Sequence, residues 1–145
     1  MSSTVVVAQG VFDILHPGHL HYLQESSLLG DELHVIIAKR EHITHKDIPV
    51  LPNKQRREMV AGLDPVDVAL AGDEENIFKP IIEIDPDIIT IGYDQDYKPK
   101  ELESKLAERD VSCSVERISE YQASGESMRL SSSAIVEKIL SERVA

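Results

Sequence analysis

Five short apolar runs, spaced along the whole chain and separated by segments of helical character, constrain the fold more than any other feature. The runs are rich in valine and isoleucine, and they cover residues 4–8, 32–38, 66–72, 87–92 and 112–118. Runs of this length and composition are typical of strands that are buried on both faces. Strands that alternate with helices predict an α/β fold, an open parallel five-stranded sheet with helices on both faces. We expect a single domain over residues 1–145.

Turn and capping residues indicate where the intervening helices begin and end. Pro17 predicts the first turn of a helix that Gly30 would end. Asn53 is a good N-cap for a helix over 54–62, whereas Pro80 limits residues 76–84 to a short or broken helix. Two further helices are expected over 99–110 and, capped by Ser131 or Ser132, at the end of the chain. Four residues are expected to share one face of the first helix: Leu20, Leu23, Ser27 and Leu28.

Charge is distributed unevenly along the chain. The net charge of −11 argues against a nucleic-acid partner. Residues 39–57 nevertheless hold six Lys and Arg residues against two acidic ones, and this basic island suits an anionic substrate. No apolar run approaches the ~18–20 residues of a membrane span, and the first residues lack the basic start of a signal peptide. Because Cys113 is the only cysteine, we expect no internal disulfide and a cytoplasmic protein without a membrane partner.

The segment His16-Pro17-Gly18-His19 follows the first predicted strand, where an open α/β sheet places its ligand site. A helix N-terminus offers unpaired N–H groups and the positive end of a dipole to an anion. Gly18 lets a phosphate approach the backbone, and both imidazoles can donate hydrogen bonds. Two other interpretations stay open, namely histidines that only cap the helix and a metal-binding pair. Since the chain has neither a G-x-G-x-x-G nor a Walker A loop, phosphate binding here needs another scheme.

The stretch GVFDILHPGH, residues 10–19, resembles the G-x-F-D-x-x-H-x-G-H signature of the nucleotidylyltransferases. Later stretches are similar to the family in order and spacing. They are the lysine loop and arginine helix of its cytidylyltransferase branch (46–60), the third strand (66–72), the fourth strand with its Gly-x-Asp turn (81–96) and the start of the last helix (129–135). The resemblance covers nearly the whole chain and implies the Rossmann-like nucleotidylyltransferase fold.

The resemblance also implies the site residues. The implied catalytic residues are His16, His19, Lys46 and Arg56. The implied ATP-binding residues are Gly10, Val11, Phe12, Asp13, His16, Gly18, His19, Gly92, Asp94, Ser131, Ser132 and Ser133. Asp13 has two interpretations, since it either orients this cluster or touches the metal, or is a turn carboxylate satisfied by backbone N–H groups. For the acceptor, Tyr93 and Tyr97 are candidates to stack on a ring, and Arg117 and Arg129 are candidates to bind its phosphate.

Within the family, the length and the GYDQ turn look most like the archaeal FAD synthetases, which are FMN adenylyltransferases. The implied partners are ATP and FMN, with Mg²⁺ or another divalent cation bridging the phosphates and no dedicated metal site on the protein. The phosphate of FMN would attack the α-phosphorus of ATP. Because the second pKa of a phosphomonoester is about 6, this nucleophile is largely a dianion at pH 7 and needs no general base.

Two alternative functions stay open. One is a glycerol-3-phosphate cytidylyltransferase that uses CTP, although Leu63-Asp64 stands where that branch carries a second arginine. The other is a nucleotide-binding sensor without turnover, from which pyrophosphate release would distinguish either enzyme. Members of the family are often dimers, so the resemblance also implies a homodimer.

Overall fold

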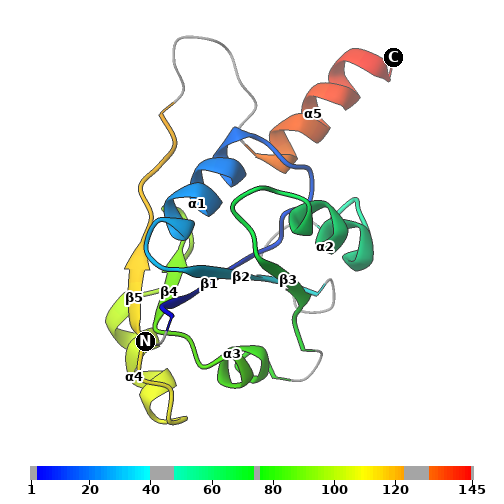
Figure 1. Ribbon diagram of the computed structural model, residues 1–145. Helices are drawn as coiled ribbons and strands as arrows, with labels where there is room; N and C mark the ends of the chain where they lie inside the picture. The colour runs from blue at the N-terminus through cyan, green and yellow to red at the C-terminus, as the bar shows by residue number, and fades with distance from the viewer. Residues whose placement is uncertain (1–2, 40–47, 74–75, 123–130, 145) are drawn as a thin grey trace.

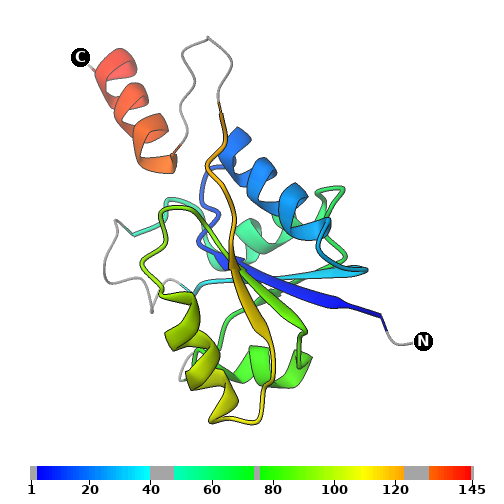
Figure 2. The same cartoon turned by 90° about the vertical axis from the view of Figure 1, so that its left-hand side faces the viewer.

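The protein, described here from a computed structural model, is built around a five-stranded parallel sheet (Figures 1 and 2). The structure describes residues 3–39, 48–73, 76–122 and 131–144. The strands are β1 (Val5–Gly10), β2 (Glu32–Ile37), β3 (Val68–Ala71), β4 (Ile88–Ile91) and β5 (Ser114–Arg117). The helices are α1 (Pro17–Ser27), α2 (Asn53–Ala61), α3 (Lys79–Ile84), α4 (Pro99–Ala107) and α5 (Ser132–Arg143).

The strand order is β3-β2-β1-β4-β5, and each neighbouring pair runs parallel. The chain leaves β1 toward β2 and β3, and later crosses back to place β4 on the other side of β1. The sequence-based prediction of an α/β fold with five parallel strands is therefore confirmed. The reversal of direction between β1 and β4 is the switch point where sheets of this kind bind ligands.

Both faces of the sheet are covered, because successive side chains of a strand point to opposite sides. Val6 of β1 packs in one apolar cluster with Leu23 of α1 and Val60 of α2. Its neighbour Val7 packs in a second cluster with Leu106 of α4. Figure 1 shows the same division, with α1 and α2 on one side of the sheet and α3 and α4 on the other.

Of the four residues predicted to share the inner face of the first helix, only Leu23 is buried. Leu23 and Ser26 are buried, whereas Leu20 and Leu28 are exposed. The Ser26 hydroxyl lies 2.8 Å from the hydroxyl of Thr90 in β4, and both side chains are fully buried. A hydrogen-bonded polar pair thus joins α1 to the sheet where the apolar pattern predicted leucines.

Gly30 does not cap α1, because Leu28 occupies the C-cap position. A Cβ atom on Gly30 would lie 2.7 Å from Val6 Cγ2 and 2.8 Å from the Thr4 carbonyl oxygen. The position requires glycine because the turn passes close to the start of β1.

The prediction that Asn53 caps the second helix is wrong. Pro52 holds the N-cap position in an extended conformation, with φ −68° and ψ 160°, and Asn53 is the first helical residue. The side-chain oxygen of Asn53 instead accepts a hydrogen bond from Arg56. The third helix is short but unbroken, because Pro80 lies in its first turn, where a missing N–H costs nothing.

The last helix begins as predicted, with Ser131 as its N-cap. The Ser131 hydroxyl accepts a hydrogen bond from Ala134 N at 3.0 Å. Ser132 accepts from Ile14 N at 3.0 Å and donates to Ile14 O at 3.1 Å, which ties the start of α5 to the loop after β1. Beyond this attachment, α5 projects from the body in both views, and its described residues include no buried one (Figures 1 and 2).

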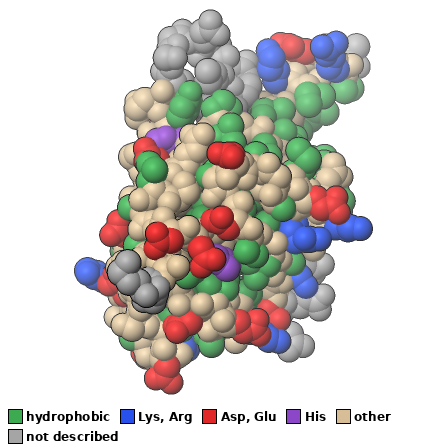
Figure 3. All heavy atoms as spheres, viewed as in Figure 1, with side chains coloured by type: hydrophobic (Ala, Val, Ile, Leu, Met, Phe, Trp, Pro, Cys, Tyr) green, Lys and Arg blue, Asp and Glu red, His purple; other side chains and the backbone are tan. Residues whose placement is uncertain are grey.

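Acidic side chains are scattered over the face shown in Figure 3, as expected for a chain with a net charge of −11. Within the described ranges, none of the helices has the length and apolar character that crossing a membrane requires.

Candidate active site

A cavity of about 930 Å³ opens where β1, β4 and β5 end, at the switch point of the sheet. This volume lies near the upper end of the range for ligand pockets, which suits a site for two nucleotides. Every residue predicted to bind ATP lines it, and so does Tyr93. The other described lining residues are Gln9, His21, Tyr22, Ile48, Pro49, Val50, Gln95, Ile118, Ser119, Glu120, Tyr121, Val136, Glu137 and Leu140.

His16 and His19 form a stacked pair at the N-terminus of α1. Their ring centroids are 3.9 Å apart with an interplanar angle of 29°. His16 is the N-cap residue, and its Nδ1 accepts a hydrogen bond from Gly18 N at 3.1 Å. This bond leaves Nε2 to carry the proton of the neutral ring. Helical N–H groups and an imidazole N–H therefore meet at one wall of the cavity, an arrangement suited to phosphate.

The electrostatic environment keeps His16 neutral. Burial lowers the pKa of its imidazole below the ordinary value of 6.5, and the nearby carboxylate of Asp94 raises it in part. A neutral ring donates a hydrogen bond through Nε2–H, and a bound polyphosphate would favour the protonated form by attraction.

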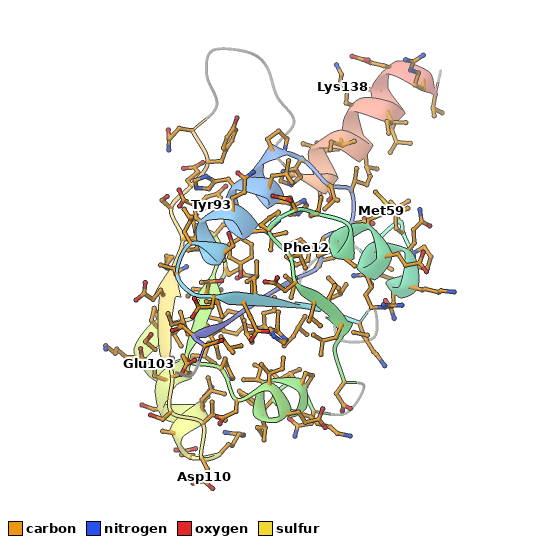
Figure 4. All side chains as sticks on the ribbon, viewed as in Figure 1. Phe12, Met59, Tyr93, Glu103, Asp110 and Lys138 are labelled. Atoms are coloured by element: carbon orange, nitrogen blue, oxygen red, sulfur yellow. The ribbon has the colours of Figure 1, made fainter. Side chains whose placement is uncertain are left out.

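The Phe12 ring packs against His19 of the histidine pair. It lies 5.3 Å from the His19 ring and 6.3 Å from that of Tyr22, measured between centroids. Phe12 has a φ of 50°, the left-handed conformation that allows its side chain to turn inward. A Cβ atom on Gly10 would lie only 2.9 Å from the Phe12 ring, so glycine is required there. Figure 4 shows Phe12 in the interior between the sheet and the helices α1 and α2.

Asp13 is a turn carboxylate satisfied by backbone N–H groups, the second of the two interpretations given for it above. Its carboxylate accepts hydrogen bonds from Val50 N at 2.8 Å and from Leu51 N at 2.9 Å. Asp13 is buried, so both oxygens serve to hold the segment 48–51, which precedes α2, against the loop after β1.

Arg56 does not lie where the resemblance suggested. Its side chain is fully buried and is not among the described residues that line the cavity. The guanidinium donates to Leu51 O at 3.0 Å, to Val11 O at 2.8 Å and to Ala38 O at 2.9 Å. Buried carbonyl groups require donors, and Arg56 supplies them for three loops at once. Its place in the structure is that of an anchor and not of a pyrophosphate ligand.

Arg117 holds the loop after β4 in the same way, by donating hydrogen bonds to its backbone carbonyls. Its guanidinium donates to Gly92 O at 3.0 Å, to Gln95 O at 2.9 Å and to the Tyr97 carbonyl. Gln95 adds a bond from Gly92 N to its side-chain oxygen at 2.7 Å. Among the described residues, neither Arg117 nor Tyr97 lines the cavity. Acceptor binding by Arg117 and Tyr97 therefore stays a prediction, while the loop that Arg117 holds places Tyr93 and Asp94 at the cavity wall.

Two predicted residues, Lys46 and Arg129, lie outside the described residues. In contrast, His21 was not predicted and yet lines the cavity, with Nε2 at 3.0 Å from Ser119 O and its ring 5.7 Å from that of Tyr121. His21 lies five residues after His16, and no signal in the sequence marks its contact with a segment almost 100 positions away.

The part of the chain that the structure describes contains no group of three or more His, Cys, Asp and Glu side chains able to hold a metal ion.

The comparisons with known proteins agree with this geometry. The cytidylyltransferase-like family model matches residues 7–138. An FAD synthase of Halorhabdus utahensis is 56% identical over 140 residues, covering 97% of this chain and 99% of the relative. An FAD synthase of Halobacterium salinarum is 54% identical over 140 residues, covering 97% and 96%.

A solved structure shares the fold. It is that of a lipopolysaccharide core biosynthesis protein from Thermoplasma volcanium, with 43% sequence identity and a TM-score of 0.81, covering 83% of this chain and all of that one. With a family model that spans most of the chain and relatives that match it almost end to end, this protein belongs to the cytidylyltransferase-like family of nucleotidyltransferases and groups there with the FAD synthases.

Proposed function

We propose that this protein is an FAD synthase that transfers AMP from ATP to FMN and releases pyrophosphate. The observation that carries the proposal is the stacked pair of His16 and His19 at the N-terminus of α1, on the wall of a cavity of about 930 Å³. The near-complete match to FAD synthases supports FMN as the acceptor.

The reaction forms one bond and breaks one. An oxygen of the FMN phosphate attacks the α-phosphorus of ATP, and the bond from that phosphorus to the α,β-bridging oxygen breaks, so the electron pair leaves with pyrophosphate. No proton needs to be removed, because the attacking phosphate is largely a dianion at pH 7. The protein must align anionic groups and stabilise charge as the leaving oxygen develops it.

His16 and His19 would donate to oxygens of the α- and β-phosphates, with the first N–H groups of α1 behind them. Gly18 would let the phosphates approach the backbone. The N-terminus of α5 reaches the same cavity through Ser133. Together these donors supply fixed positive potential without a lysine or arginine from the described lining residues.

The remaining predicted contacts are part of the same proposal. Asp94 would accept hydrogen bonds from the ribose hydroxyls of ATP, with Gly92 beside it, and Tyr93 would border a ring. Lys46 and Arg129 stay predictions as ligands for the triphosphate and for the acceptor phosphate.

Mg²⁺ would enter on the ATP phosphates and, when bound, neutralise part of their charge. The cytoplasmic location and the homodimer expected from the sequence also stay predictions, and sedimentation of the purified protein tests the dimer.

We predict that His19→Ala lowers kcat by ~10²-fold or more and leaves the binding of ATP almost unchanged, because the lost donor acts mainly on charge that develops in the transition state. Steady-state kinetics and an ATP titration by calorimetry check the two halves of this statement. His34→Ala, in β2 outside the cavity lining, is the matched control. Turnover that survives in the His19 variant would contradict the mechanism.

The experiment that tests the function is a two-by-two turnover assay with Mg²⁺ present, in which ATP or CTP is paired with FMN or glycerol 3-phosphate. FAD formed from ATP and FMN alone is the expected result. Product from CTP and glycerol 3-phosphate would reassign the enzyme to the cytidylyltransferase alternative. Absence of pyrophosphate release from every pair would favour the sensor.

A further inference from the structure

Four aliphatic side chains line the cavity from the segment before α2 and from α5, and we call this set the aliphatic wall: Ile48, Val50, Val136 and Leu140. Ile48, Val50 and Leu140 have 58%, 63% and 55% of their surface exposed. A single exposed aliphatic residue needs no explanation, but several that line one ligand cavity leave a contiguous apolar surface in water.

Charged groups hold the segment that carries half of this wall. The Asp13 carboxylate binds Val50 N and Leu51 N, and the fully buried Arg56 guanidinium binds Leu51 O. Burying charged groups is costly unless they are paired or hydrogen-bonded. Here the hydrogen bonds to Val50 and Leu51 offset that cost for Asp13 and Arg56. The backbone of Ile48 and Val50 is therefore positioned before a ligand arrives, which spares the ordering cost of binding.

Another part of the cavity lining has a different chemistry. It is formed by the loop after β4 and the segment after β5, where the polar residues Asp94, Gln95, Ser119 and Glu120 line the cavity beside Tyr93, Ile118 and Tyr121. In the strand order β3-β2-β1-β4-β5, these segments lie on one side of β1. The segment before α2 lies on the other side, because Arg56 links it to Ala38, which follows β2. The phosphate-binding end of α1 follows β1 itself, so the cavity offers a polar and an apolar side flanking one phosphate site.

ATP and FMN, the two substrates of the proposed function, differ in how polar the edges of their ring systems are. Adenine carries ring nitrogens and an amino group around its edge, and an aliphatic surface satisfies none of them. Isoalloxazine has one hydrocarbon edge, its dimethylbenzene ring, and a hydrogen-bonding edge opposite to it. We propose that the aliphatic wall, through Ile48 and Val50 together with Val136 and Leu140, binds the dimethylbenzene edge of FMN. The adenosine of ATP then occupies the polar side, which includes Asp94.

This subsite rests on the proposed function, and its test separates the two. The variant is the double substitution Ile48→Thr/Val50→Thr, which preserves side-chain branching and leaves the Val50 N–H bond to Asp13 in place. The matched control is Ile77→Thr/Val68→Thr, an equivalent pair with 50% and 41% exposure outside the described cavity lining. The Michaelis constants for FMN and for ATP are measured separately, together with the melting temperature.

We expect the KM for FMN to rise about tenfold in the Ile48/Val50 variant, since each lost methyl contact is worth about fourfold in affinity. The KM for ATP and the melting temperature should change little, and the control should resemble the unmodified protein. A rise in the KM for ATP instead, or no change for FMN, would overturn the subsite while FAD formation by the unmodified protein still upheld the function. If the unmodified protein forms no FAD, the function and the subsite both fail.

A second measurement needs no substitution. An FMN analogue that lacks the two ring methyl groups should bind the unmodified protein more weakly than FMN, by a factor of about four or more. In the double variant this discrimination should shrink, because the partner surface has lost its own methyl groups. Equal affinity of FMN and the analogue for the unmodified protein would contradict the proposed contact.

Discussion

His16 shows how two opposing influences set the charge of one side chain in the site. Burial lowers its pKa and Asp94 raises it, and burial is the larger influence. Because the folded-state pKa lies below the unfolded value of 6.5, this residue contributes stability in full above pH 6.5. The contribution is lost as the pH falls through the folded-state pKa. Neutral His16 is thus the form that meets the substrate at pH 7.

Asp94→Asn should lower the pKa of His16 further, because removing the carboxylate leaves the effect of burial unopposed. An NMR titration of the His16 ring, followed in the unmodified protein and in the variant, measures the change. Asp96→Asn is the matched control, since Asp96 lies in the same loop outside the described cavity lining. A His16 titration that moves upward in the Asp94 variant would contradict the contact.

Arg117→Lys should raise the KM for ATP by about tenfold, because an ammonium group cannot reach all four carbonyls that the guanidinium holds, those of Gly92, Tyr93, Gln95 and Tyr97. The exposed side chain makes these bonds in water, so the free energy of unfolding should fall by only about 1 kcal/mol. Steady-state kinetics and urea unfolding give both values. Arg143→Lys, at the exposed end of α5, is the control. A large loss of stability with an unchanged KM would mean that Arg117 supports the fold and not the site.

At the scale of elements, the site depends on long-range attachments between loops and helices. Asp13 and Arg56 hold the segment before α2, Arg117 holds the loop after β4, and Ser132 holds the start of α5. The attachment of α5 is the one that a single substitution should weaken most, because this helix contributes no buried residue from its described range.

Ser132→Ala should detach the start of α5, because it removes both hydrogen bonds to Ile14. Hydrogen exchange of residues 132–143 should accelerate, and turnover should fall by tenfold or more, since α5 lines the cavity through Ser133 and Val136. Ser141→Ala removes a hydroxyl that donates to Lys138 O within α5 and is the matched control. Unchanged exchange in the Ser132 variant would show that other contacts hold the helix.

At the scale of the whole molecule, the protein combines a net charge of −11 with the proposed binding of anionic substrates. The overall electrostatic field of this acidic protein repels anionic substrates. Hydrogen-bond donors gathered in the cavity must therefore overcome that repulsion. The described ion pairs lie at the surface, as with Lys54–Glu58 at 3.9 Å and Lys138–Glu142 at 2.7 Å. Pairs of this kind are worth about 0–1 kcal/mol each, so repulsion among the excess acidic groups dominates the long-range electrostatics.

The melting temperature should therefore rise by roughly 2–5 °C between 0.01 and 0.15 M KCl, an estimate that assumes screening of about 1 kcal/mol of self-repulsion. Over this interval the Debye length falls from about 30 Å to about 8 Å. Thermal unfolding followed by circular dichroism measures the change, and choline chloride in place of KCl separates screening from specific potassium binding. A fall in melting temperature would mean that the ion pairs outweigh the repulsion.

Much of the architecture follows from the sequence alone. The five strands, the first turn of α1 at Pro17 and the cap of α5 at Ser131 were predicted because they depend on local periodicity and local hydrogen bonds. The histidine pair was predicted in the same way, since a strand that ends before a helix marks the ligand side of a parallel sheet.

The sequence by itself determined which strands and helices form and at which end of the sheet the histidine pair lies. Only the tertiary structure decided what Arg56, Arg117 and Ser132 do, because each binds backbone carbonyl or amide groups far away in the chain. Every residue presents nearly the same carbonyl group, so no residue type marks the partner of a buried guanidinium. The aliphatic wall has the same origin, since Val50 and Leu140 line one cavity only after the sheet has brought their segments together.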